Sequence, residues 1–172
     1  MDRENGRIDE AARIAVRYSE EKDLDYVLKA EKEEENARFV GQWSKEEHRA
    51  SLEEKDILHI LFEEKDSGKP VGYAILAGLA KSGGVIEFRR IVITEKGKGY
   101  GREALRLIKK MAFKQLGAHR LWLDVREQNS RAQHLYGSEG FVKEGMLREC
   151  VLTEEGYESL LVMSILENEY GA

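Results

Sequence analysis

Residues 85–116 read VIEFRRIVITEKGKGYGREALRLIKKMAFKQL. The fold predicted for the whole chain follows from this stretch. Residues 85–93 are rich in Val, Ile and Phe, a composition typical of a strand. Helical spacing then relates the apolar residues Leu105, Ile108, Met111, Ala112 and Leu116. The stretch therefore predicts a strand, a glycine-rich turn and a helix.

The turn, residues 94–101 (TEKGKGYG), has the composition of an anion-binding loop. Its glycines lack the Cβ atoms that would block a curved backbone, so successive N–H groups can converge on one point. The unpaired N–H groups and the dipole of the following helix face the same point. Because Lys96, Lys98 and Arg102 add positive charge, a phosphate or pyrophosphate is the predicted ligand. A glycine-rich turn without a ligand is the alternative.

A dinucleotide site is a second alternative for this turn. Residues 99–104 fit G-x-G-x-x-A, and Asp124 follows about twenty residues on, as the dinucleotide fingerprint expects. Against it, residues 94–98 separate the strand from Gly99, where a dinucleotide fold would turn at once. A P-loop does not fit, because no Gly-Lys-Ser/Thr follows the glycines.

The segments on either side of residues 85–93 predict the rest of the sheet. Strand-like residues 56–64 and 71–79 flank the turn signal DSGKP at 66–70, which predicts an antiparallel meander ending at 85–93. Residues 119–125 must run parallel to 85–93, because one crossover helix returns the chain to the same end.

The two ends of the chain add further elements. Residues 13–18 predict the first strand, Ser19 the cap of the first helix, and residues 44–47 (SKEE) a capping box for another helix. Residues 141–150 and 157–166 predict a closing pair of strands. The predicted class is a single α/β domain.

Two motifs carry a family resemblance. Residues 96–101, KGKGYG, resemble the Q/R-x-x-G-x-G/A signature of the GNAT superfamily, the acetyl-CoA-dependent N-acetyltransferases. Lysine stands where Gln or Arg is usual, which keeps the charge and loses the planar fork. LWLDV at 121–125 is similar to the family's next strand, and the motifs N-x-x-A-x-x-L-Y and G-F are matched by Asn129, Ala132, Leu135, Tyr136, Gly140 and Phe141. Residues 145–148, 157–158 and 163–166 resemble the branch that includes ribosomal-protein N-terminal and spermidine acetyltransferases.

The resemblance implies a fold and a cofactor site. The expected fold is a mixed, mostly antiparallel sheet, with a central parallel strand pair splayed around acetyl-CoA and helices on both faces. By the same resemblance, the residues that bind acetyl-CoA are the backbone of Ile91, Val92 and Ile93, the turn residues Lys96, Gly97, Lys98, Gly99, Tyr100, Gly101 and Arg102, and Asn129. Asn129 as a plain helix N-cap is the alternative.

Acetyl transfer to an amine requires a base, because a primary amine with a pKa near 10.4 is neutral in only about one molecule in two thousand at pH 7. Glu87, a carboxylate in an otherwise apolar strand, is the predicted base, and an ion pair with Arg89 is the alternative. Tyr136 is the predicted general acid for the departing thiolate, by its place in the second motif. Packing of its ring against the sheet is the alternative.

Residues 31–35 (EKEEE) are expected either to attract a cationic acceptor or to form an exposed acidic helix face. The predicted acceptor-binding residues are Glu35, Phe39 and Trp43, although an aromatic residue between helices is also typical of core.

Composition limits the remaining classes of function. The 172 residues suit one domain, expected at 12–172 after a disordered segment 1–11. A net charge of −5 argues against nucleic-acid binding, and no apolar run suits a membrane span or a signal peptide, so a cytoplasmic protein is expected. Cys150, the single cysteine, is expected to be buried, and the scattered histidines predict no metal site.

The sequence therefore predicts an N-acetyltransferase that transfers the acetyl group of acetyl-CoA, by direct attack, to a primary amine. A polyamine, an N-terminal peptide amine or another small amine would fit as acceptor. A non-catalytic acetyl-CoA-binding or sensor module is the alternative from another class, and a dinucleotide-binding oxidoreductase is the third. An exposed edge at the C-terminal hairpin is expected to allow a homodimer.

Overall fold

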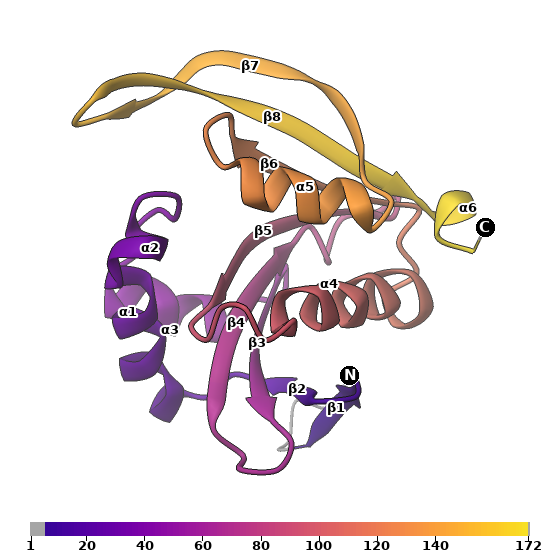
Figure 1. Cartoon of the computed structure of the whole chain (residues 1–172). Helices are drawn as coiled ribbons and strands as arrows, with labels where there is room; N and C mark the ends of the chain where they lie inside the picture. Colours follow the sequence, from indigo (N-terminus) through magenta and orange to yellow (C-terminus); the bar gives the residue numbers. More distant parts are fainter. Residues whose placement is uncertain (1–5, 172) are drawn as a thin grey trace.

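In the computed structural model, which describes residues 6–171, the strands form one eight-stranded sheet in the order β1-β2-β3-β4-β5-β6-β8-β7. Figure 1 shows this sheet with helices on either side. The strands are β1 (Arg7–Glu10), β2 (Ile14–Tyr18), β3 (Ile57–Glu64), β4 (Pro70–Ala77), β5 (Val85–Ile93), β6 (Arg120–Arg126), β7 (Val142–Thr153) and β8 (Gly156–Leu166). The expected meander of β3, β4 and β5 is confirmed.

The parallel pair of β5 and β6 lies at the centre of the sheet and separates along its length. The two strands pair only at Val85↔Arg120, Ile86↔Leu121 and Glu87↔Trp122. Both strands continue beyond these pairs without bonding to each other. The predicted mixed sheet with a splayed parallel pair is therefore confirmed.

Helices cover both faces of this sheet. The helical segments are η1 (Glu21–Asp23), α1 (Leu24–Lys32), α2 (Glu34–Ala37), α3 (Lys45–Glu53), α4 (Tyr100–Lys110), its π-helical continuation η2 (Met111–Gln115), α5 (Ser130–Ser138) and α6 (Glu167–Tyr170). Figure 1 shows α1, α2 and α3 gathered at one side of the sheet, and α4 and α5 at the other. The expected capping box is present at the start of α3, where Ser44 and Glu47 bond to each other's backbone.

Two hydrophobic clusters attach these layers to the sheet. Leu105 and Ile108 of α4 pack with Ile86 and Phe88 of β5 in the larger cluster. Val27 and Ala30 of α1 pack with Tyr73 and Val92 in the smaller one, on the opposite face. The register between β4 and β5 shifts between Phe88 and Arg90 of β5. This irregularity changes the face to which the side chains point, so Ile86 and Phe88 before it and Val92 after it join different clusters.

Three expectations are wrong. Residues 7–10 form β1, which pairs with β2, instead of belonging to a disordered segment; residues 1–5 of that segment lie outside the described part. Ser19 does not cap the first helix: Glu20 is the N-cap of η1 and Asp23 that of α1, and Ser19 Oγ hydrogen-bonds His59 Nδ1 at 2.8 Å. Cys150 is exposed on β7, because this edge strand has no layer packed over it.

Within residues 6–171, no helix is long and apolar enough to cross a membrane.

Candidate active site

The glycine turn before α4 has the geometry of an anion-binding loop. Gly97 and Gly99 have φ of 80° and 79°, a region that residues with a Cβ rarely adopt. A Cβ at Gly99 would lie 2.5 Å from Arg13 Nη2, and Arg13 also donates a hydrogen bond to the Lys98 carbonyl. Within residues 6–171, the backbone N–H groups of Gly99, Tyr100 and Gly101 have no acceptor. The turn therefore offers unpaired donors where an anion can bind.

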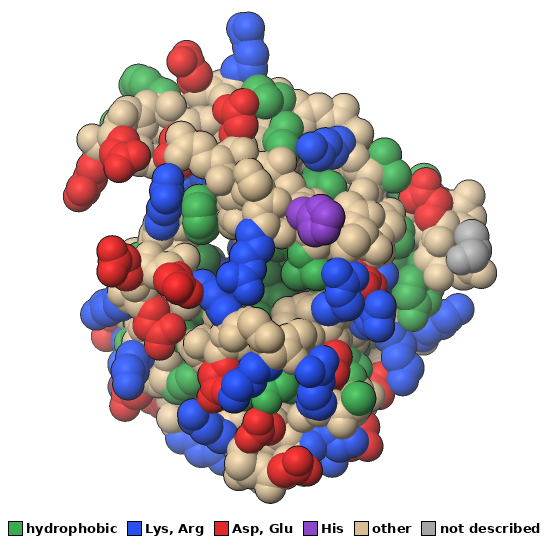
Figure 2. All heavy atoms as spheres, in the orientation of Figure 1, with side chains coloured by type: hydrophobic (Ala, Val, Ile, Leu, Met, Phe, Trp, Pro, Cys, Tyr) green, Lys and Arg blue, Asp and Glu red, His purple; other side chains and the backbone are tan. Residues whose placement is uncertain are grey.

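A cleft of about 920 Å³, here called the large cleft, opens beside residues 91–93 of β5, beyond the last pair of this strand with β6. Figure 2 shows a hollow across the middle of this face, with Lys and Arg side chains along it. The predicted cofactor residues that line the large cleft are Ile91, Val92, Ile93, Lys96, Gly97, Gly99, Tyr100, Gly101, Arg102 and Asn129. Lys98 does not line it, because its ammonium pairs with Glu95. The cleft is wide and polar enough at the turn to accept a phosphate-bearing cofactor.

Neighbouring residues hold two of the basic groups at the turn. Lys96 Nζ bonds Asn36 Oδ1 at 2.8 Å and pairs with Glu35 at 3.2 Å, which joins the turn to α2. Arg102 pairs at 2.6 Å with Glu139, at the end of α5. Burial tends to raise the pKa of Glu139, but hydrogen bonds from Arg106, Arg102 and Lys109 lower it to about 2. Glu139 is therefore ionised and fixes α5 against α4.

A second cavity of about 240 Å³, here called the small cavity, adjoins the large cleft. The residues that line both are Phe39, Val40, Ile91, Asn129 and Tyr136. The small cavity is completed by Gly41, Phe88, Arg89, Arg90, Asp124, Val125, Arg126, Val151 and Leu160. Two adjoining spaces with a shared wall suit a reaction between two bound molecules.

Tyr136 lies on the shared wall. Its ring packs edge-on against Phe88, with centroids 6.2 Å apart, and near Phe141. Burial, and secondarily the charge of Asp124, raises the pKa of Tyr136, so the phenol keeps its proton. The Tyr136 ring therefore packs against neighbouring aromatic residues, as the alternative to a catalytic role predicted, and the residue also lines both cavities.

Glu87 and Trp43 do not line either cavity. Glu87 forms an ion pair with Arg89 at 2.8 Å, the arrangement that the alternative expected. Trp43 lies over Arg90, whose guanidinium carbon is 4.5 Å from a ring centroid. Of the other predicted acceptor residues, Phe39 lines both cavities, and Glu35 lies exposed at the rim of the large cleft.

Asn129 is both a helix N-cap and a residue of the cleft, the two alternatives that the sequence left open. Its Oδ1 accepts a hydrogen bond from the Ala132 backbone at 3.2 Å, which caps α5, and the residue also lines both cavities.

Sequence reasoning missed Asp124 as an acceptor-side residue. It lines the small cavity, and its side chain is exposed there. Desolvation by the surrounding protein, with a smaller contribution from the charge of Glu87, raises the pKa of Asp124, although Arg126 opposes this. The signal was the register: Trp122 pairs with Glu87, so Asp124 falls on the same face, two residues on.

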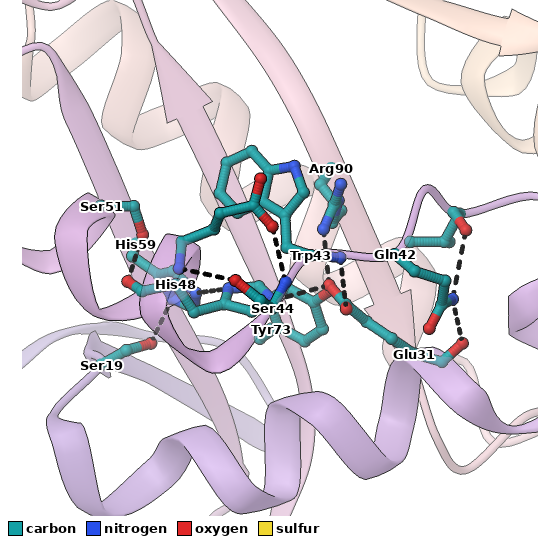
Figure 3. Close-up of polar contacts among 12 residues, drawn as sticks. Ser19, Glu31, Gln42, Trp43, Ser44, His48, Ser51, His59, Tyr73 and Arg90 are labelled. Atoms are coloured by element: carbon teal, nitrogen blue, oxygen red, sulfur yellow. Dashed lines mark hydrogen bonds and ion pairs between the residues drawn. The ribbon is translucent and has the colours of Figure 1, made fainter.

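Sequence reasoning also missed a buried polar network beside the small cavity (Figure 3). Glu31 was expected in an acidic run, yet its carboxylate is buried and accepts hydrogen bonds from Tyr73 and Arg90. His48 Nε2 lies 2.9 Å from Glu31 Oε1, and His48 Nδ1 lies 3.2 Å from His59 Nε2. Burial tends to raise the pKa of Glu31, but the bonds from His48 and Tyr73 and the charge of Arg90 lower it.

In residues 6–171, no group of His, Cys, Asp and Glu is suited to hold a metal ion.

Comparisons with known proteins agree with this geometry. A model of the Acetyltransferase (GNAT) family matches residues 24–141. Spermidine N(1)-acetyltransferase of Escherichia coli (strain K12) is 28% identical over 166 residues, which cover 91% of this chain and 88% of that protein. The Vibrio cholerae serotype O1 spermidine N(1)-acetyltransferase is 35% identical over 85 residues, a match that spans 49% of each protein.

Solved structures show the same fold. The crystal structure of spermidine N-acetyltransferase from Vibrio cholerae in complex with CoA and spermine superposes with a TM-score of 0.85 at 22% identity, covering 94% of this chain and 100% of that chain. The family model covers well over half of the sequence, and the splayed strand pair and glycine turn are those expected of it. The chain therefore belongs to the GNAT acetyltransferase family.

Proposed function

We propose that this protein transfers the acetyl group of acetyl-CoA to a primary amine of a small polycation, with polyamines as the acceptor class. The observation that carries the proposal is the junction of the large cleft and the small cavity at Tyr136. One space ends at an anion-binding turn and the other at a carboxylate, so a cofactor and an amine can meet between them.

In the large cleft, the residues present fit acetyl-CoA, which supplies the thioester to be cleaved. The unpaired N–H groups of Gly99 and Gly101, with Lys96 and Arg102, would hold the pyrophosphate. Residues Ile91 to Ile93 of β5 pair with β4 on one side and do not pair with β6 on the other, so this second edge would bond the pantetheine arm as a neighbouring strand does.

Tyr136 would stabilise the departing thiolate. A thiol has a pKa of about 8.5, and the pKa of Tyr136 is raised from its ordinary value of 10.0, so the proton stays on the phenol oxygen. Its role would be a hydrogen bond to the sulfur as charge develops there. Tyr136→Phe is expected to lower kcat about 100-fold with little change in acetyl-CoA affinity. Packing alone would leave kcat unchanged.

The acidic rim supports a cationic acceptor. Glu34 and Glu35 are exposed at the edge of the large cleft, close to Phe39. The two relatives compared above are named for spermidine, which is a polycation. An N-terminal peptide amine or another small amine remains the alternative acceptor.

A non-catalytic acetyl-CoA-binding module is favoured by one observation, the position of Glu87 outside both cavities. The discriminating experiment is calorimetric titration with acetyl-CoA, CoA and NADH, followed by thiol release with spermidine, spermine, putrescine and a peptide amine. We expect binding of acetyl-CoA and CoA, no binding of NADH, and release that depends on a polyamine. Acetyl-CoA binding without release on any amine would favour the binding module.

We also propose a homodimer through the C-terminal hairpin. β7 is the edge strand of the sheet and exposes Val142, Met146, Leu147 and Leu152. Sedimentation velocity of the wild type and of a Met146→Glu, Leu147→Glu variant would test it, since the charged variant is expected to be monomeric. A cytoplasmic location remains a prediction from composition.

A further inference from the structure

The arginines that line the small cavity are all neutralised by carboxylates that do not line it. Arg89 pairs with Glu87 at 2.8 Å, Arg90 with Glu31, and Arg126 with Glu158 at 2.7 Å. Three nearby positive charges are therefore cancelled by fixed partners. An anionic group on the acceptor would have to displace one of these pairs.

Asp124 is the exception among the charged residues of the small cavity. Within residues 6–171, its carboxylate forms no hydrogen bond and no ion pair, although its side chain is exposed in the cavity. The other lining residues are uncharged apart from the paired arginines. The small cavity thus contains one uncompensated negative charge, which suits a positively charged ligand.

The strand register places this charge beside the gap between β5 and β6. Glu87↔Trp122 is the last pair between β5 and β6, and Asp124 is the next residue of β6 on that face. It therefore stands where the strands begin to separate, and it lines the small cavity together with Tyr136. The electrostatic influence of Asp124 on Tyr136 agrees with this proximity.

We propose that Asp124 binds the ammonium group of the acceptor and accepts its first proton, a role that rests on the acetyl transfer proposed above. The acceptor enters as R–NH₃⁺, and one N–H proton passes to the carboxylate and then to water. The freed lone pair forms the N–C bond to the acetyl carbon, while the C–S bond breaks and its electrons remain on sulfur. The second N–H proton ends on the sulfur as the CoA thiol forms.

The electrostatic setting of Asp124 agrees with this role. Desolvation and the nearby Glu87 raise the pKa of Asp124, which brings this pKa closer to that of the ammonium group from which Asp124 must accept a proton. Glu87 and Arg126 are the charged groups that face it from β5 and from its own strand. A carboxylate without an ion-pair partner among residues 6–171 can exchange protons without breaking an ion pair.

The test compares Asp124→Asn with Asp25→Asn, an exposed aspartate on α1 that lines neither cavity. Asp124→Asn is expected to lower kcat/KM for spermidine by about 100-fold or more and to flatten the acidic limb of its pH profile. Asp25→Asn should match the wild type. The acetyl-CoA Kd should be the same in all three proteins. A kcat/KM for Asp124→Asn within threefold of the wild type would overturn the proposal.

A second measurement separates this inference from the proposed function. Spermidine binding to the protein without acetyl-CoA, followed by calorimetry, should weaken about 10-fold or more in Asp124→Asn, because a charge-assisted contact is lost. Asp124→Glu, which keeps the charge, should retain part of the affinity. Equal affinity in Asp124→Asn would refute the inference even if the wild type transfers acetyl groups. A wild type that binds acetyl-CoA and spermidine without thiol release would instead refute the proposed function.

Discussion

Glu31 and Asp124 are two carboxylates beside the same small cavity, and their surroundings are opposite. Glu31 is buried on α1 and accepts hydrogen bonds from Tyr73, Arg90 and the Trp43 backbone. Asp124 is exposed on β6 and, among residues 6–171, has no partner. The charge of Glu31 is compensated by hydrogen-bond donors inside the protein, whereas the charge of Asp124 is accessible to a ligand.

The protonation behaviour of the two carboxyls diverges in the same way. The pKa of Glu31 lies below its ordinary value, because its hydrogen-bond donors and Arg90 outweigh the effect of burial. The pKa of Asp124 lies above its ordinary value, because desolvation and the charge of Glu87 are not offset by a bonded cation. Two carboxyls pushed apart in this way indicate separate roles, one in stability and one in proton transfer.

The largest expected effect follows from breaking the buried pair. Glu31→Ala leaves the Arg90 guanidinium, which is 9% exposed, without its carboxylate. Loss of one partner of a buried ion pair costs about 3–5 kcal/mol. Urea unfolding followed by circular dichroism should show this loss in the free energy of unfolding. Asp124→Asn is the matched control, expected within about 0.5 kcal/mol of the wild type. Equal losses in the two variants would contradict the distinction between these carboxylates.

A smaller effect concerns the histidines of the buried network. Burial, and then the charges of His48 and Arg90, lower the pKa of His59 to about 3, while Glu31 and Asp23 act in the opposite direction. The unfolded chain takes up a proton as the pH falls through about 6.5, whereas folded His59 does not until about pH 3. The contribution of His59 to stability is therefore complete above pH 6.5 and falls as the pH is lowered towards 3.

The measurement is the free energy of unfolding at pH 6 and at pH 5. The wild type should lose about 1 kcal/mol more than His59→Gln over this interval. The range avoids the lower pH at which Glu31 and Asp23 begin to titrate. His134→Gln, at an exposed histidine, should behave as the wild type. If His59→Gln showed the same pH dependence as the wild type, His59 would take up its proton in the folded protein as readily as in the unfolded chain.

The sequence predicted the features that depend on local patterns. The glycines and basic residues at 96–102 specify a left-handed turn and a helix start, which are local consequences of backbone geometry. The parallel pairing of β5 and β6 followed from one crossover helix. Six of the predicted cofactor positions that line the large cleft belong to this turn and helix start, whereas Ile91, Val92, Ile93 and Asn129 were assigned from the family resemblance.

The acceptor side was less predictable, because it depends on contacts between distant segments. Glu31 looked like part of a solvated acidic run, and only the packing of α1 onto β4 and β5 buries it. Trp43 was expected in a pocket, but the position of Arg90 beneath its ring became visible only in three dimensions. Asp124 needed the β5–β6 register before its face could be assigned.

The smallest expected effect concerns Glu87, which was the base predicted from sequence. Glu87→Gln removes a negative charge near Asp124 and releases Arg89, and both changes should lower the pKa of Asp124 towards its ordinary value. The acidic limb of the kcat/KM profile should therefore move to lower pH by a fraction of a unit, with its plateau within about threefold of the wild type.

The alternative outcome for this variant is distinct. If Glu87 were the base, its plateau would fall by about 100-fold or more and the acidic limb would flatten. Glu46→Gln, at an exposed position in the first turn of α3, supplies a control for a lost surface charge. Because both variants remove one charge, only the position beside Asp124 can account for a shift that appears in Glu87→Gln alone. Such a shift would show that Glu87 tunes the reacting carboxylate without touching the acceptor.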